Sequence, residues 1–362
     1  MEITKLEIRP YQNDDCGAIA CFFDRCFLNN LKFTARSHDS EYYLWKYKEN
    51  PWGKPAVFLA VTDGKIIGLF SVVPKTIRIK NETLRIGETG DAYIDPNYQG
   101  TGVLWKLISH AFKSMKKQNI SSFYTIANEP TLKIWTELFK FKKLFEYRSM
   151  VLPLDFSDIF KKRLNLGPLS SFLALPCNLF YRTFYRQPNV SISQNIQFQK
   201  VDGADKRLDE FWEERGSNGQ FTFVKNSEFF KYRYSSNPEK YGIYILQNDK
   251  EVLGYSVLKF TDLFNMKCGH IVDFMVSKND ALLLRKIIGL SLDLIKKEGA
   301  QIASSWAIEE TAYYKIFKRF GFITRKKRYH VIFGGDIIKR DDAHLMLNSN
   351  SWLFTHGDSD NI

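Results

Sequence analysis

Hydrophobic and polar residues alternate along the first half of the chain in a pattern that predicts an antiparallel β-meander. Runs rich in β-branched and aromatic residues mark the expected strands. These runs are residues 6–9, 57–61, 66–73, 76–79 and 84–94. Asp63-Gly64 lies between two of them, and this dipeptide between apolar strands is a strong hairpin signal. Asn81-Glu82 separates the last two runs.

Two helices are expected near the N-terminus. The first covers residues 16–28. The second begins at Asp39 or Ser40, which are both good N-cap types. It ends before Asn50-Pro51, because the residue before a proline avoids the helical region.

A glycine-containing loop follows the meander and leads into a long amphipathic helix. Asp95-Pro96-Asn97 is a turn signal, and Gly100 and Gly102 lie just before the helix. The apolar residues of this helix recur at helical spacing. They are Val103, Leu104, Leu107, Ile108, Ala111, Phe112 and Met115. Glycines let the backbone approach a ligand, and the free N–H groups of a helix start favour an anion, so the loop predicts a phosphate site.

The second half of the chain repeats the first. Residues 40–51 line up with residues 227–238, which lie 187 positions later, and Asp91 lines up with Asp273, 182 positions later. Further matches follow in the same order with slowly drifting offsets. They are Gly68 with Gly254, Ser121-Ser122-Phe123 with Ser304-Ser305-Trp306, and Phe139-Lys140-Phe141 with Phe320-Gly321-Phe322. An ordered set of matches indicates two copies of one α/β unit.

The two copies differ where the phosphate loop would lie. The second copy has Ser277-Lys278-Asn279-Asp280-Ala281 before its helix, expected over residues 282–296, and no glycine is among these five residues. A backbone cradle for a diphosphate is therefore expected in the first copy alone. Two roles stay open for the second copy, which are shaping the acceptor pocket and a purely structural one.

The loop of the first copy resembles the acyl-CoA pyrophosphate loop of the GNAT acyltransferase superfamily. That loop is written Gln/Arg-x-x-Gly-x-Gly/Ala, and Gln99 and Gly102 match its first two fixed positions. Leu104 departs from the third position, where Gly or Ala is usual. Phe139-Lys140-Phe141 and the run from Phe317 to Phe322 are similar to the family's closing motif.

The resemblance implies an α/β fold of the α+β kind, with two tandem GNAT-like domains. Each domain would hold a mixed, mostly antiparallel sheet flanked by helices. The boundaries expected are 1–155 for the acyl-CoA-binding GNAT domain, 156–196 for a partly helical linker, 197–335 for a second domain with a degenerate cofactor loop, and 336–362 for a C-terminal tail. The tail carries Trp352 and Phe354, which would dock on the body of the protein, unless the tail is a frayed end.

The resemblance also implies a set of cofactor contacts. Backbone N–H groups of the loop would hold the diphosphate, and the last residues of the preceding strand would pair with pantetheine. The residues that match are Ala92, Tyr93, Ile94, Gln99, Gly100, Thr101, Gly102, Val103 and Leu104. Asn128 would contact the pantetheine arm or cap the helix that begins near Pro130, and the two roles are compatible.

Two carboxylates are candidates for the catalytic base. Glu88 lies six residues before Ile94, where some family members carry a basic glutamate. Period two places Glu88 on the face of Ala92 and Ile94, whereas Asp91 joins that face only if a bulge interrupts the strand. Both could instead be ordinary surface or core acids. Family members often carry a tyrosine as acid, but the matching positions here are Thr136 or Trp135. Water would then protonate the thiolate or, alternatively, Tyr93 or Tyr124 would do so.

Composition places limits on the cofactors and the compartment. The 362 residues carry a formal net charge of +12, which favours polyanionic partners such as coenzyme A. The five cysteines form no Cys-x-x-Cys pair and the six histidines are scattered, so neither a disulfide framework nor a metal site is expected. The sequence shows no signal peptide and no membrane-spanning run, which favours a cytoplasmic location.

Within the stretch 164–190, residues 169–181 are apolar and have basic residues on both sides. It predicts a linker helix packed across both domains or, alternatively, a segment in peripheral contact with the inner membrane surface.

We expect a bacterial N-acyltransferase that moves an acyl group from acetyl-CoA, or another acyl-CoA, to an amine in a ternary complex. The acceptor class favoured is an amino sugar or another cell-envelope precursor, from a loose likeness of Trp45-Lys46-Tyr47 and Asn50-Pro51 to acyltransferases of surface-glycan synthesis. The alternatives are a Fem-type transferase that uses charged tRNA and a non-catalytic acyl-CoA sensor. No nucleic-acid partner is expected, because the Gln99–Leu104 loop argues for coenzyme A.

Overall fold

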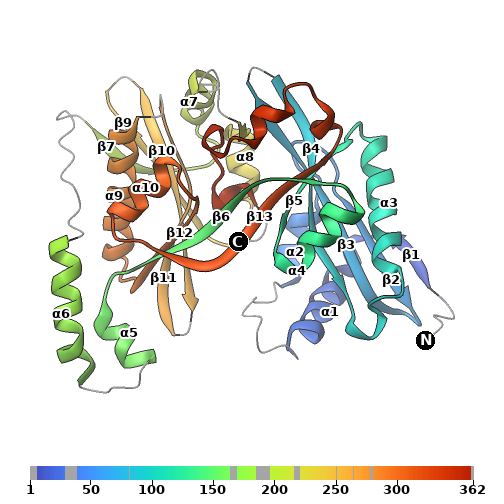
Figure 1. The fold of residues 1–362 in the computed structure, drawn as a ribbon, viewed down its shortest axis with the longest axis horizontal. Helices are drawn as coiled ribbons and strands as arrows, with labels where there is room; N and C mark the ends of the chain where they lie inside the picture. The colour runs from blue at the N-terminus through green and yellow to red at the C-terminus, as the bar shows by residue number, and fades with distance from the viewer. Residues whose placement is uncertain are drawn as a thin grey trace.

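The structure is a computed structural model in which two lobes flank a central group of strands (Figure 1). It describes residues 6–28, 39–80, 82–163, 169–184, 196–215, 221–249, 251–263, 265–277 and 280–359. Within these residues, 13 strands form a single sheet with helices on its faces. The strand order is β1-β2-β3-β4-β5-β13-β6-β12-β11-β10-β9-β7, with β8 paired to β3. Most pairs are antiparallel, and only β4·β5 and β11·β12 are parallel.

The first copy follows the predicted order of elements. They are β1 (Glu7–Pro10), α1 (Cys16–Leu28), α2 (Ser40–Tyr47), β2 (Ala56–Thr62), β3 (Lys65–Ile79), β4 (Glu82–Ile94), α3 (Val103–Lys117), β5 (Ser122–Ala127), α4 (Glu129–Lys133) and β6 (Lys142–Pro153). Asp63 and Gly64 have φ values of 48° and 73°, as the predicted hairpin turn requires.

One strand prediction was wrong. The runs 66–73 and 76–79 belong to the single strand β3, which continues through Pro74. Proline is tolerated there because the β2 ladder ends at Ala56↔Val72, so Pro74 pairs only with Gly87 of β4. The predicted separator Asn81 lies outside the described residues, and Glu82 is already part of β4.

The second copy repeats this order after two linker helices. The linker holds α5 (Phe156–Arg163) and α6 (Leu169–Phe184). The elements that follow are β7 (Gln197–Val201), α7 (Arg207–Arg215), β8 (Thr222–Phe223), α8 (Ser227–Phe230), β9 (Tyr241–Gln247), β10 (Val252–Leu263), β11 (Met266–Val276), α9 (Ala281–Lys297), β12 (Ile302–Ile308), α10 (Ala312–Arg319) and β13 (Ile323–Gly335).

The two copies exchange strands at the centre of the sheet. β13 of the second copy lies between β5 and β6 of the first and is antiparallel to both. β6 in turn pairs with β12 of the second copy. A boundary in the sequence is therefore not a boundary in the sheet, and the limits 155, 196 and 335 stay predictions.

Equivalent residues of the two copies meet each other. Trp45 of α2 stacks on Tyr232, the residue 187 positions later, with ring centroids 5.2 Å apart and planes 23° from parallel. The Trp45 indole N–H also donates to the Tyr232 carbonyl over 3.0 Å. A contact between matched positions indicates an approximate two-fold relation between the copies.

Helices cover both faces of the first copy's strands. α3 packs on one face with Phe70, Val72 and Ile94, whereas α1 and α2 pack on the other with Leu59 and Leu69. The C-terminal tail is docked, because Trp352 and Phe354 are buried in the main core. Docking resolves the alternative that the sequence left open for this segment.

Candidate active site

β4 and β5 part from each other in the middle of the first copy. Their parallel ladder consists of Gly87↔Phe123 and Glu88↔Tyr124, although β4 runs on to Ile94 and β5 to Ala127. Ala92 is exposed on the separated part of β4. The backbone of β4 beyond Glu88 is thus an edge that can pair with an extended ligand such as a pantetheine arm.

The loop after β4 is held by its own side chains. The Gln99 amide donates to the Ile94 carbonyl over 3.2 Å, and the Thr101 hydroxyl donates to the Tyr98 carbonyl over 2.6 Å. Gly100 and Gly102 both have φ of +78°, in the left-handed region that favours glycine. A Cβ at either glycine would meet no atom within 4 Å, so the space in front of the loop is open.

The N-terminus of α3 carries no side-chain cap. Gly102 is the N-cap residue, and no side chain accepts a hydrogen bond from the first turn. Val103 is buried and Leu104 packs against the core beneath the helix, so Leu104 lies away from the loop. Uncapped N–H groups at the positive end of a helix form an anion-binding site.

The equivalent helix of the second copy is capped by a carboxylate. The Asp280 side chain accepts from the Leu282 N–H at 2.7 Å and from the Leu283 N–H at 3.2 Å. Residues 278 and 279 lie outside the described part. A phosphate would have to displace Asp280, so the geometry favours anion binding at α3.

A β-bulge decides which carboxylates share a face of β4. Ser71 pairs with Gly90 and Leu69 with Tyr93, so two β4 residues lie opposite one β3 residue, and Asp91 has φ of +43°. The bulge places Asp91 on the same face as Glu88, because their partners Ser71 and Lys75 share one face of β3. In a strand with regular alternation, Asp91 would lie on the opposite face from Glu88.

Asp91 has three partners and a partly open side chain. The Lys46 ammonium lies 2.7 Å away, the Tyr47 hydroxyl donates over 3.0 Å, and the Ser71 hydroxyl donates over 3.2 Å. Burial and the neighbouring Asp91 raise the pKa of Tyr47 well above its ordinary value, so Tyr47 stays a hydrogen-bond donor. The Asp91 side chain keeps 16% of its exposure.

Glu88 lies in a sealed position. It forms an ion pair of 2.7 Å with Lys75, and both side chains are only 4% exposed. The Lys75 ammonium also donates to the Asp358 carbonyl over 3.2 Å, so the C-terminal segment covers this pair. The arrangement is typical of a structural ion pair.

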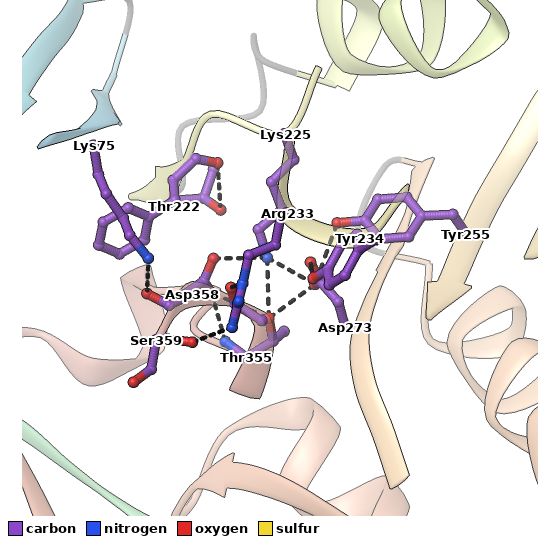
Figure 2. A network of polar contacts seen from close by, with 12 residues as sticks. Lys75, Thr222, Lys225, Arg233, Tyr234, Tyr255, Asp273, Thr355, Asp358 and Ser359 are labelled. Atoms are coloured by element: carbon purple, nitrogen blue, oxygen red, sulfur yellow. Dashed lines mark hydrogen bonds and ion pairs between the residues drawn. The ribbon is translucent and has the colours of Figure 1, made fainter. Parts of the chain in front are cut away.

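The C-terminal segment inserts its polar groups between the copies (Figure 2). Lys225 lies 2.7 Å from Asp273 and 2.9 Å from Asp358, and all three side chains are fully buried. Arg233 donates to the carbonyls of Gly357 and Ser359. Burial raises the pKa of Asp358. Burial lowers the pKa of Lys225, but the two carboxylates outweigh it, and the net shift is upward.

Sequence reasoning missed this buried network. Its only signal was an acid four residues after the second of two aromatic anchors in the tail, Asp358 after Trp352 and Phe354. No pattern in the sequence links Lys225 to a segment that lies more than a hundred residues away.

The remaining predicted site residues have clear positions. Asn128 caps α4 by accepting from the Thr131 N–H over 3.1 Å. The Tyr93 ring packs against Phe22 and Phe23. Its contribution to a ligand site on β4 would therefore come from its backbone. Trp135 is buried, and the Thr136 hydroxyl donates to the Leu132 carbonyl, so neither supplies an acid.

Comparison with known families agrees with this geometry. A sequence model of the acetyltransferase (GNAT) domain matches residues 7–132. The first copy is thus similar in sequence to a GNAT acetyltransferase domain. No curated protein sequence matches it.

Several solved structures resemble the fold of this chain over most of its length. N-myristoyltransferase of Saccharomyces cerevisiae with bound myristoyl-CoA aligns at 11% identity and a TM-score of 0.65, over 92% of this chain and 83% of that one. A tandem GNAT protein from the clavulanic acid biosynthesis pathway aligns at 12% and 0.60, over 91% and 98% of the two chains. A probable N-acyltransferase from Enterococcus faecalis aligns at 11% and 0.59, over 91% and 72%. At such identity the likeness concerns the fold.

Two features are absent from the described residues. No group of three or more His, Cys, Asp or Glu side chains among them is placed to hold a metal ion. None of the helices in the described ranges combines the length and the apolar character that crossing a bilayer requires.

Proposed function

We propose that this GNAT protein transfers an acyl group from an acyl-CoA, acetyl-CoA in the first instance, to an amine. The observation that carries the proposal is the uncapped N-terminus of α3, which lies at the end of β4 where β4 and β5 diverge. A diphosphate at this helix end would align the pantetheine arm with the part of β4 that lies beyond its ladder with β5. The reacting thioester would then lie near the bulge at Asp91.

The backbone supplies most of the catalysis in this proposal. N–H groups from Gly100 to Leu104 hold the diphosphate, and the backbone of Ala92, Tyr93 and Ile94 pairs with pantetheine and polarises the thioester carbonyl. The amine nitrogen attacks the carbonyl carbon, a C–N bond forms, and the C–S bond breaks. The thiolate leaves and takes a proton from water, which suffices because a thiol pKa is about 8.5.

Asp91 is the better of the two candidate bases. Its side chain retains exposure, so an incoming ammonium group can reach it directly or through one water. Glu88 would have to give up Lys75 in a site covered by the C-terminal segment. Asp91 therefore accepts the ammonium proton in this proposal, and Glu88 has a structural role as the buried partner of Lys75.

The acceptor proposed is an amino sugar or another amine-bearing envelope precursor, met in the cytoplasm or at the inner membrane surface. Its support is the carboxylate of Asp91, which keeps some exposure and attracts an ammonium group.

The decisive experiment is ligand-induced stabilisation. Acetyl-CoA should raise the melting temperature, because a ligand that binds only the folded state stabilises it. Gly102→Trp should abolish the shift, since the indole would fill the open space before the loop. Absence of a shift with acetyl-CoA and with longer acyl-CoAs would overturn the proposal.

Asp91→Asn tests the chemical step separately. We expect kcat for a responsive amine to fall about a hundredfold or more, with the acetyl-CoA shift retained, because general-base catalysis contributes about 10²–10⁴ in rate. Glu88→Gln is the matched comparison, and a larger fall in kcat for that variant would exchange the two roles. Tight binding of acetyl-CoA without thiol release for any amine would favour the sensor, an alternative supported by the Lys46 ion pair that already occupies Asp91.

A further inference from the structure

Helix α6 turns its apolar side outward. Five of its large apolar side chains between positions 169 and 179 are between 49% and 77% exposed. They are Leu169, Phe172, Leu173, Leu175 and Leu179. At about 100° per residue these five lie within a little less than half of the helix circumference. A surface helix of a globular protein normally has the opposite orientation, with its polar side exposed to water.

The polar side of α6 faces the protein. The Asn178 side chain accepts from the Phe156 N–H over 3.1 Å, at the start of α5, and lies 3.5 Å from Asp155. Ala174, on the same side of the helix, is fully buried. The inverted orientation is thus fixed by specific contacts with α5, and the apolar side is left for another medium.

The two linker helices stand apart from the sheet. α5 and α6 pack against each other, and among the described elements neither has comparably extensive packing with any other (Figure 1). Nothing in the described part of the chain covers the apolar side of α6. A contiguous exposed apolar patch of this kind marks an interaction surface.

Charge identifies the partner. Between Ile159 and Val201 the sequence has no Asp or Glu and six basic residues. They are Lys161, Lys162, Arg163, Arg182, Arg186 and Lys200. Exposed apolar side chains within a purely basic stretch fit an anionic lipid surface, where the apolar groups enter the acyl boundary and the cations meet headgroups. A protein groove or a second copy would account for the apolar side but not for the absence of acids.

We propose that α6 docks this protein on an anionic bilayer, lying in the interface with its apolar side buried in the lipid. The proposal gives a physical basis to the membrane-surface location included in the proposed function. Membrane docking itself does not depend on acyl transfer, and it rests on the proposed function only for the reason why this enzyme would need a membrane. The docking surface consists of the five apolar side chains named above together with Lys161.

Vesicle flotation of the full chain tests the proposal. The probe is a phosphatidylcholine vesicle with about 30% phosphatidylglycerol, compared with pure phosphatidylcholine, because anionic lipid attracts basic segments. We expect binding to the anionic vesicle alone, weakened as salt rises from about 0.1 M to about 0.5 M, since screening shortens the reach of surface charges.

Substitutions on α6 should remove the binding. Leu175→Asp should lower the bound fraction about tenfold, because a charge replaces the centre of the apolar side. Leu347→Asp is the matched control, since Leu347 is also exposed, at 53% against 65% for Leu175, on another part of the surface. Lys161→Glu should weaken binding, whereas Lys297→Glu at the end of α9 should not.

Three results would overturn the proposal. They are no flotation of the wild type, equal flotation with neutral vesicles, and equal loss for the α6 variants and their controls. Self-association that disappears with Leu175→Asp, without vesicle binding, would assign the surface to a second copy. The acetyl-CoA melting shift, measured on the same variants, should be unchanged, so failure of docking and failure of the proposed function are separable.

Discussion

The starts of α3 and α9 occupy equivalent places in the two copies but offer opposite surfaces to an anion. At α3 the N-cap is Gly102, and the first turn is uncapped behind an open space. At α9 the carboxylate of Asp280 takes two N–H groups. One helix start attracts a phosphate and the other already holds an anion of its own. The comparison teaches that an aspartate cap closes a ligand site without changing the fold around it.

The matched acids Asp91 and Asp273 show the same divergence between the copies. Tyr47 donates to Asp91 and Tyr234 donates to Asp273, at 3.0 Å and 2.8 Å, so the Tyr–Asp pair survives in both copies. Asp91 stays partly exposed beside Lys46. Asp273 is sealed by Lys225 and by the Thr355 hydroxyl of the C-terminal segment. The tail has thus turned one of two related carboxylates into part of the core.

The largest expected effect comes from removing the cation beside each acid, and it concerns the free energy of unfolding. Lys225→Met leaves Asp273 and Asp358 buried together without their cation, and removal of one partner from a buried ion pair costs about 3–5 kcal/mol. Lys46→Met is the matched change in the first copy. It should cost less than half as much, because Asp91 keeps two hydroxyl donors and access to water.

Urea unfolding of both variants measures the difference. Equal losses for Lys225→Met and Lys46→Met would mean that the second acid is no more dependent on its cation than the first, and the contrast between an open and a sealed acid would fail. A loss confined to Lys46→Met would reverse it.

A second contrast concerns the residue three positions before each acid. Glu88 of β4 forms an ion pair with Lys75 of the neighbouring strand β3. At the matching place in the second copy, the His270 ring lies 2.6 Å from the Thr261 hydroxyl. Burial, and secondarily Lys259, lowers the pKa of His270 from its ordinary value of 6.5 to about 4. The folded protein therefore favours the neutral ring, whereas the unfolded chain binds a proton below about pH 6.5.

Stability should accordingly decline as the pH falls. The contribution of His270 is fully present above about pH 6.5 and shrinks toward pH 4, by about 2 kcal/mol at pH 5. Urea midpoints measured across this range should show a smaller decline for His270→Gln than for the wild type. An identical decline in the two proteins would contradict the assignment to His270.

Local sequence signals were enough for most of the fold. The Asp63-Gly64 turn, the caps at Asp39 and Asn128, and the ordered matches between the copies each depend on a few neighbouring residues, and the structure confirms them. Strand exchange was not predictable, because β6 and β13 have the same pattern whichever copy they join.

The site was only partly predictable for a similar reason. The open loop followed from Gly100 and Gly102, but the choice between Glu88 and Asp91 depended on a bulge. A bulge adds one residue to one strand and leaves no fixed sequence mark when the residue is Asp. The burial of Glu88 came from the tail, far away in the sequence.

The smallest effect separates backbone strain from ligand binding. Gly102 and Gly299 have φ of +78° and +76°, and a Cβ at either would meet no atom within 4 Å. Gly102 begins α3 at the loop, whereas Gly299 follows the end of α9.

Alanine at either position should cost about 1–2 kcal/mol of folding free energy from left-handed backbone strain alone. Only Gly102→Ala should also weaken the binding of acetyl-CoA, because the N–H groups of its loop must keep their present direction to contact a diphosphate. Unfolding and acetyl-CoA titration of both variants decide the matter: matched stability losses with weakened binding in Gly102→Ala alone would place the ligand at the first copy's loop, whereas unaltered binding in both would move it elsewhere.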